Sequence, residues 1–309
     1  MASPLTNVGS RPAAYGPPEW GLTLVIGVIW GSAFLWIALG VDFLAPGVVA
    51  FGRVAFGAAA LAAFGRARRA IAREHWPRIA AIAVLGNAGP ALLFAQAETE
   101  LDSAVAGMIT AGTPVITLVV ASIMLHRLPG AAQTIGIGIG FIGIVLMSAP
   151  SLVGADATPV GVLLVVIATI GYAINSNLIV PLQQRYGGPA VIMWALVASS
   201  VLLAPVAAMG LGSSEFRASS VIAVLILGIL GTGVARALAA TLAGRVGAPR
   251  MTTTTYLVPI VAIVLGVAFR NEVVAPVALI GVAIVLVGAY VATRAVPDPV
   301  VTVGGQPAP

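Results

Sequence analysis

The second half of this chain repeats its first half at a constant offset. Pro114 and Pro259 are 259 − 114 = 145 residues apart, and Leu85-Gly86 recurs with the same spacing as Leu230-Gly231. Each repeat holds five apolar segments, each roughly the 20 residues that a helix needs to cross a bilayer. An odd number of spans places the second repeat upside down relative to the first. Inverted repeats are typical of secondary transporters, which bind their substrate where the repeats meet.

The composition indicates that a bilayer is the solvent of this chain. Hydrophobic residues make up 60% of its 309 residues and charged residues only 8%, which is too little charge to cover a soluble domain. We therefore predict an all-α membrane protein with ten transmembrane helices arranged as two inverted five-helix repeats. The predicted spans are 20–39, 44–64, 79–97, 103–125, 134–148, 160–180, 189–209, 220–243, 252–269 and 275–291.

The same pattern divides the chain into five parts. They are a disordered cytoplasmic N-terminus (1–19), a first repeat (20–149), a linker (150–158), a second repeat (159–294) and a disordered cytoplasmic tail (295–309). Arginines concentrate in alternate loops, and the loops between them hold only Arg217 and Arg270. This asymmetry follows the positive-inside rule. It predicts a multi-pass protein of the cell (inner) membrane with both termini in the cytoplasm.

The chain lacks the residues that several classes of function require. The chain has no cysteine, and its two histidines, His75 and His126, fall in predicted loops. No Ser–His pair or Asp pair lies inside a span, so we expect no catalytic residue, no metal site, no cofactor and no enzyme activity. The net charge of +5 is sorted by loop rather than gathered in a patch, so we expect no nucleic-acid partner.

Motifs in both repeats resemble those of a known family. They are Trp30-Gly-Ser-Ala-Phe-Leu-Trp-Ile-Ala-Leu-Gly40, Leu230-Gly-Thr and Tyr256-Leu-Val-Pro259 followed by Asn271-Glu272. In order and spacing they resemble the EamA-type carriers of the drug/metabolite transporter superfamily, over residues 20–294. The resemblance implies a ten-helix alternating-access carrier with a central cavity, often one that exports amino acids. The chain departs from the family where Arg127 takes the place that Glu272 has in the second repeat.

Two arginines fall inside predicted spans, and ionisable groups at that depth are functional candidates. Arg236 is the candidate for binding an anionic group of the substrate, because a guanidinium stays charged and offers a planar fork of donors. Thr232 lies four residues before it and is expected on the same helix face. For Arg53 we favour a bracing role within the bundle.

Uncharged polar and aromatic residues complete the predicted substrate site. They are Tyr172, Asn175, Tyr256, Thr113, Asn87, Gln96 and Trp30. Pro114 and Pro259 are expected to kink two equivalent helices beside the cavity.

These residues predict a secondary transporter that moves a small polar metabolite, an amino acid being one candidate and export the favoured direction. An uptake carrier for another solute is the alternative, and a channel or scramblase is a weaker one. No carboxylate lies deep in a span, which favours facilitated transport, and Glu98 is the one near-membrane acid that could reach a cavity. The expected partners are a small-molecule substrate and the lipid bilayer. Gly136 and Gly140 form a GxxxG pair; packing within a monomer is favoured, and a homodimer is the other possibility.

Overall fold

The computed structural model describes residues 16–124, 131–153, 158–246 and 251–294, and within these ranges the chain is helical, with no strand. The first repeat contains α1 (Pro17–Val41), α2 (Pro46–Ala62), α3 (Trp76–Ala83), the π-helix η3 (Val84–Ala88), α4 (Gly89–Ala97), α5 (Ser103–Thr110), α6 (Thr113–Met124) and α7 (Ala131–Val153). Short 3₁₀ turns, η1 (Gly65–Arg68) and η2 (Arg73–His75), connect α2 to α3.

The second repeat has the same order of elements. It contains α8 (Pro159–Tyr186), α9 (Gly188–Gly210), the 3₁₀ turn η4 (Leu211–Ser213), α10 (Ala218–Ile226), the π-helix η5 (Leu227–Val234), α11 (Ala235–Val246), the 3₁₀ helix η6 (Thr252–Tyr256), α13 (Val258–Arg270) and α14 (Pro276–Arg294). Joined end to end, the described helices form ten spans.

Five of the described helical stretches are long and apolar enough to cross a membrane. They are Pro17–Val41, Arg73–Ala97, Pro159–Ile179, Gly188–Ser213 and Ala218–Leu242. Shorter apolar helices occupy Pro46–Ala62, Thr134–Gly143, Thr254–Arg270 and Pro276–Gly288. The fold is thus an all-α membrane fold built from two repeats, as predicted.

Some boundaries differ from those read from the sequence. Helix α1 begins at Pro17, inside the segment expected to be disordered, because Pro17 and Pro18 suit a first helical turn. Helix α7 extends to Val153, four residues beyond the expected end of the first repeat. The other predicted terminal residues, 1–15 and 295–309, lie outside the described part of the chain.

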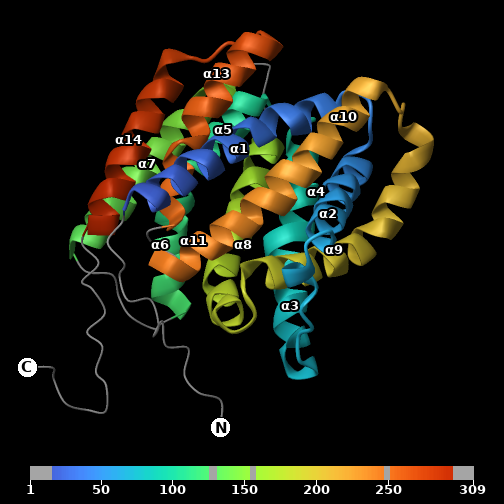
Figure 1. The fold of residues 1–309 in the computed structure, drawn as a ribbon. Helices are drawn as coiled ribbons and strands as arrows, with labels where there is room; N and C mark the ends of the chain where they lie inside the picture. Colours follow the sequence, from blue (N-terminus) through green and yellow to red (C-terminus); the bar gives the residue numbers. More distant parts are fainter. Residues whose placement is uncertain (1–15, 125–130, 154–157, 247–250, 295–309) are drawn as a thin grey trace, which may run out of the picture.

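The helices pack in pairs that respect the two-fold relation between repeats. Helices α7 and α14 lie side by side at one edge of the molecule and α2 and α9 at the other, with the remaining helices between them (Figure 1). Helix α4 packs against α8, and correspondingly α1 packs against α10 and α11. Exchanging the two repeats therefore maps these contacts onto one another.

Helices that correspond in the two repeats, such as α1 and α8, run in opposite directions, because α1 ends at the face of the molecule where α8 begins. Helix α1 ends where α10 begins, since the hydroxyl of Ser220 donates to the carbonyl of Leu39 (2.7 Å). Helix α4 ends where α8 begins, since the backbone N–H of Thr158 donates to the carbonyl of Glu100 (2.9 Å). These ends lie on one face of the molecule, which we call the acidic face because it carries Asp42, Glu98, Glu100, Glu215 and Glu272.

Glycines allow the edge helices α7 and α14 to touch along their backbones. A Cβ added at Gly143 would lie 2.6 Å from the backbone nitrogen of Val285, and one added at Gly288 would lie 2.8 Å from the carbonyl oxygen of Gly136. The glycine face predicted at Gly136 and Gly140 thus packs against the equivalent helix of the second repeat within one chain.

Helix irregularities recur at equivalent positions near the centre. The π-helices η3 and η5 contain Gly86 and Gly231, which are 145 residues apart. Pro114 lies in the first turn of α6 and Pro259 in the first turn of α13, and each follows a break between two helical segments. Proline suits such a first turn because its missing N–H has no helical partner there.

Candidate functional site

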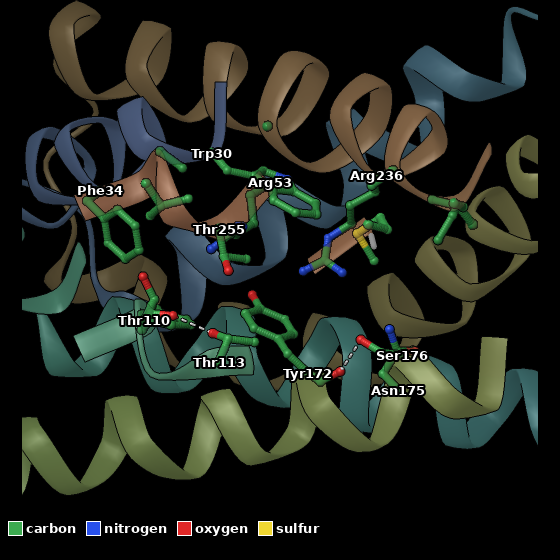
Figure 2. Close-up of a pocket in the computed structure, with 18 of the residues that line it drawn as sticks. Trp30, Phe34, Arg53, Thr110, Thr113, Tyr172, Asn175, Ser176, Arg236 and Thr255 are labelled. Carbon is green, nitrogen blue, oxygen red and sulfur yellow. Dashed lines mark hydrogen bonds between the residues drawn. The ribbon is translucent and has the colours of Figure 1, made fainter. Parts of the chain in front are cut away.

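A cavity of about 140 Å³ lies between the two repeats. Helices of both repeats contribute to it (Figure 2). Its lining residues are Trp30, Ala33, Phe34, Ile37, Arg53, Phe94, Thr110, Thr113, Tyr172, Asn175, Ser176, Ile179, Ile192, Gly231, Arg236, Ala239, Ala240, Met251, Thr255 and Val258. Most are apolar, as in binding pockets for small molecules.

The repeat symmetry places equivalent residues on opposite walls. Thr110 and Thr255 are 145 residues apart and both line the cavity, as do Trp30 and Asn175. The charges do not follow this symmetry, because the position equivalent to Arg236 is an alanine, Ala91. The lining therefore follows the repeat symmetry in part, and its charges do not.

Arg236 directs an unpaired guanidinium into this space. It lies in the first turn of α11, directly after the π-helix η5. Its Cζ is 4.9 Å from the ring centroid of Tyr172 on α8, so the two side chains form a cation–π pair (Figure 2). Its Nε is buried and has no hydrogen-bond partner among the residues that the structure describes. The N–H groups of this guanidinium are therefore available to bind an anion.

Arg53 is the second cation of the cavity. It is buried on α2, and its Nε donates to the hydroxyl of Thr232 on η5 (3.2 Å), which links the two repeats. Its Nη1 is buried without a partner in the described ranges. Arg53 thus braces the bundle, as expected, and also faces the cavity. No acidic residue is among the described residues that line the cavity.

Aromatic rings close the cavity toward the acidic face. The rings of Phe34 and Phe94 meet edge to face with centroids 5.6 Å apart, and Phe94 stacks on Tyr172 at 5.8 Å. Trp30 adds a further apolar surface. Such rings provide a large hydrophobic contact area for a ligand.

Five of the predicted substrate-site residues line the cavity, and they come from α1, α6, α8 and α11. They are Trp30, Thr113, Tyr172, Asn175 and Arg236. Asn175 lies against Gly86, where an added Cβ would come within 2.8 Å of its Nδ2. A glycine is therefore needed for α8 to approach η3 this closely.

The other four predicted residues are not part of the lining. Thr232 is buried and accepts the Arg53 hydrogen bond, while Asn87 donates to the carbonyl of Ile82 (3.0 Å). Both belong to π-helices, and the hydroxyl of Thr232 is directed to Arg53 on α2 rather than into the cavity. Gln96 is exposed and bonds to Thr99.

Tyr256 is also absent from the lining, although its neighbour Thr255 is present. The predicted face of this segment assumed α-helical spacing through Pro259. The structure instead forms the 3₁₀ helix η6, which has three residues per turn and so turns different side chains inward.

The predicted substrate site left out six polar or aromatic lining residues. They are Phe34, Arg53, Phe94, Thr110, Ser176 and Thr255. One available signal was the offset of 145 residues, because Thr110 and Thr255 are equivalent threonines. The two phenylalanines gave no signal, since an aromatic residue in an apolar span is usually part of the core.

Contacts between the repeats hold the acidic face closed. The guanidinium of Arg270 forms a bidentate ion pair with Asp42. The carboxylate of Glu272 accepts bonds from the backbone N–H groups of Ser103 (3.1 Å) and Ala104 (2.9 Å), at the N-terminus of α5. A carboxylate is favourable at this end of a helix.

No group of three or more histidines or acidic residues that could hold a metal ion is found in the described ranges. The groups that the cavity offers to a ligand are two guanidinium groups, hydroxyls, an amide and aromatic rings.

Comparisons with known proteins give matches along most of the chain. A sequence model described as the EamA-like transporter family matches residues 20–149 and again 159–294. A protein of Streptantibioticus cattleyicolor named "Probable terminal-alkyne amino-acid exporter" is 27% identical over 279 residues, covering 89% of this chain and 93% of the relative. An "Uncharacterized transporter" of Archaeoglobus fulgidus is 24% identical over 276 residues, covering 89% of this chain and 99% of the relative.

A crystal structure of another protein has the same fold. It superposes on this chain with a TM-score of 0.65 at 18% sequence identity, and the match covers 88% of this chain and 95% of the other.

Proposed function

Because this chain belongs to the EamA-like transporter family, we propose that it is a secondary carrier for a small metabolite that combines a carboxylate with an apolar body. The protein is a multi-pass membrane transporter, not an enzyme. The substrate class, the direction and the mechanism are the parts that we propose.

The unpaired guanidinium of Arg236 carries this proposal. The residue is only partly buried, but a guanidinium that is partly removed from water gains from a counter-ion. Nε of Arg236 lacks a partner among the described residues, and the described lining offers no acid to neutralise it. A bound carboxylate would supply the missing charge and match the geometry of the guanidinium fork.

The remaining lining supports an apolar body on the substrate, and an apolar amino acid as the leading candidate. Phe34, Phe94 and Trp30 offer hydrophobic surface on one side of Arg236. An ammonium group could donate to Oδ1 of Asn175, which is buried without a described partner. The name of the Streptantibioticus relative, an amino-acid exporter, supports export as the direction.

Alternating access is supported by the arrangement of the repeats. The cavity lies where they meet, and the acidic face beyond it is closed by the pair Asp42–Arg270. Exchange of the two repeat conformations would close one face and open the other. We place the acidic face outside the cell (inner) membrane and both termini in the cytoplasm, with the monomer as the working unit.

A ligand series tests the substrate class. Purified protein in detergent is heated with L-phenylalanine, with 3-phenylpropionate, which lacks the amine, and with phenethylamine, which lacks the carboxylate. We expect stabilisation by the first two and none by the third. Stabilisation by phenethylamine alone would contradict a carboxylate site. Comparing the stabilisation by L-phenylalanine with that by L-serine then tests whether the site requires an apolar body.

A channel or an uptake carrier remains the competing function. Counterflow in proteoliposomes separates a carrier from a channel, since a carrier exchanges labelled for unlabelled substrate and saturates, whereas a channel passes solute without saturation.

A further inference from the structure

Glu98 is a buried carboxyl group that substrate recognition does not use. It directly follows the last residue of the span Arg73–Ala97, at the end of α4. Only 9% of the residue is exposed, and neither carboxyl oxygen has a hydrogen-bond partner among the described residues. It lies one helical turn from Phe94, which lines the cavity, on the side of the acidic face.

We propose that Glu98 is a proton-binding site at the outer end of the cavity: it holds a proton while the acidic face is closed, as here, and releases it to the outer solution when that face opens. A buried carboxylate without donors is unstable, whereas the neutral acid is tolerated. Opening would bring water to the group and stabilise its charged form. The inference rests on the alternating-access function proposed above.

The surrounding charges agree with this assignment. Burial raises the pKa of Glu98 well above its ordinary value, and the nearby carboxylate of Glu272 raises it further. Arg53 on α2 and Arg270 on α13 lower it, as does a weak contact with the backbone N–H of Ala38 on α1, which does not reach the geometry of a hydrogen bond. Burial is the largest of these influences.

The neighbouring charged groups have interactions of their own. Arg270 is paired with Asp42, Arg53 bonds to Thr232, and Glu272 caps α5. Three other ionisable groups on these elements or next to them are Tyr172 on α8, which pairs with Arg236, Asp102 at the start of α5, and Glu100, which bonds to Thr158. Arg185 and Tyr186 lie at the other end of α8, and Glu19 lies at the other end of α1.

The sign of the pH effect follows from linkage. A carboxyl group in water has a pKa of about 4.3 and is ionised near neutral pH. Because the closed state binds one more proton than the open state, raising the outer pH favours opening, by up to about tenfold per pH unit. The proton comes from the outer solution and returns to it, so the site shifts the equilibrium between the closed and open states and transfers no net proton.

Cysteine accessibility tests the proposal directly, because the chain has no native cysteine. Ile37→Cys places a thiol on a buried cavity position, 2% exposed, that an impermeant reagent from outside can reach only when the acidic face opens. Val273→Cys is the reference, since Val273 is 90% exposed on that face. Right-side-out membrane vesicles are labelled with a charged methanethiosulfonate between pH 5.5 and 8, with equal pH on both sides.

We expect the labelling of the Ile37→Cys thiol, divided by that of the Val273→Cys thiol, to rise severalfold with pH in the otherwise wild-type protein. This ratio should stay flat and low in Glu98→Gln, which mimics the protonated acid. Glu100→Gln is the matched control, and it should keep the rise because that carboxylate is partnered by Thr158. A flat ratio in the wild-type background would overturn the proposal without any Glu98 variant. An undiminished rise in Glu98→Gln, or its loss in Glu100→Gln, would also overturn it.

This readout needs no substrate. If carboxylates fail to bind but the labelling ratio depends on Glu98, the substrate class is wrong and the proton site stands. If carboxylates bind and the ratio is flat, the reverse holds.

Discussion

The guanidinium of Arg236 lies over the ring of Tyr172, 4.9 Å from its centroid, and this contact orients the charge in the cavity. Tyr172 in turn stacks on Phe94 of the first repeat, so the position of the cation depends on both repeats. A cation–π pair contributes about 0.5–2 kcal/mol, more as it is desolvated. The site thus holds a cation by aromatic contact and leaves its donors to the ligand.

Tyr172 should therefore act through its ring. Tyr172→Phe keeps the ring and should keep substrate affinity within about twofold. Tyr172→Leu removes the cation–π pair and should weaken binding by roughly two- to thirtyfold, the equivalent of its free energy. Substrate titration by thermal stabilisation measures both. Equal affinities in the two variants would show that the ring does not position Arg236.

Gly86 should tolerate no side chain. A Cβ there would collide with Asn175, whereas a Cβ at Gly138 would meet nothing within 4 Å. Gly86→Ala should lower the melting temperature and substrate affinity, since overpacking costs about 1–3 kcal/mol. Gly138→Ala is the matched control and should change neither. Unchanged melting and binding in Gly86→Ala would disprove the close approach of α8 to η3.

The repeat pattern made the fold predictable, while the local helix geometry hid part of the site. Pro114/Pro259 and the five-span count suffice to derive two inverted repeats, because apolar length and spacing are properties of sequence alone. Thr232 and Tyr256 could not be placed this way. A π-helix and a 3₁₀ helix interrupt these spans, and Thr232 bonds to Arg53 on a distant helix, so α-helical spacing alone could not show which side chains line the cavity.

The burial of Glu98 is a second feature that could not be predicted from the sequence. The sequence placed this residue at a helix end, as the one near-membrane acid that could reach a cavity, and could not indicate how far it is buried. The structure buries it, with Phe94 one turn away on the same helix, because the acidic face is closed by contacts between distant segments such as Asp42–Arg270. Sequence spacing cannot report a closure made by residues so far apart.

The orientation in the membrane is open to a direct test. Reporter fusions after Arg73 and at the C-terminus should give cytoplasmic signals, and a fusion at Glu215 an external one, as the positive-inside rule predicts. Opposite orientations of residue 73 and residue 294 would contradict the inverted-repeat topology.

Coupling is the next prediction. In voltage-clamped proteoliposomes, an imposed pH gradient should change the rate of transport but should not concentrate phenylalanine above equilibrium, because no acid lines the described cavity. Accumulation driven by the gradient would mean that a proton crosses with each cycle. Its loss in Glu98→Gln would then identify Glu98 as the group that carries this proton.

Counterflow of labelled phenylalanine by Arg236 variants tests the central claim most directly. Arg236→Gln removes the charge and Arg236→Lys removes the fork, whereas Arg66→Gln, an exposed arginine on η1, is the matched control. With equal amounts of inserted protein, we predict that Arg236→Gln loses at least about tenfold in transport efficiency, the effect of losing a charge-assisted hydrogen bond of roughly 1.5–3 kcal/mol. Arg236→Lys should lose much of it, and Arg66→Gln should match the wild type. Saturable exchange at the wild-type rate in Arg236→Gln would contradict the account.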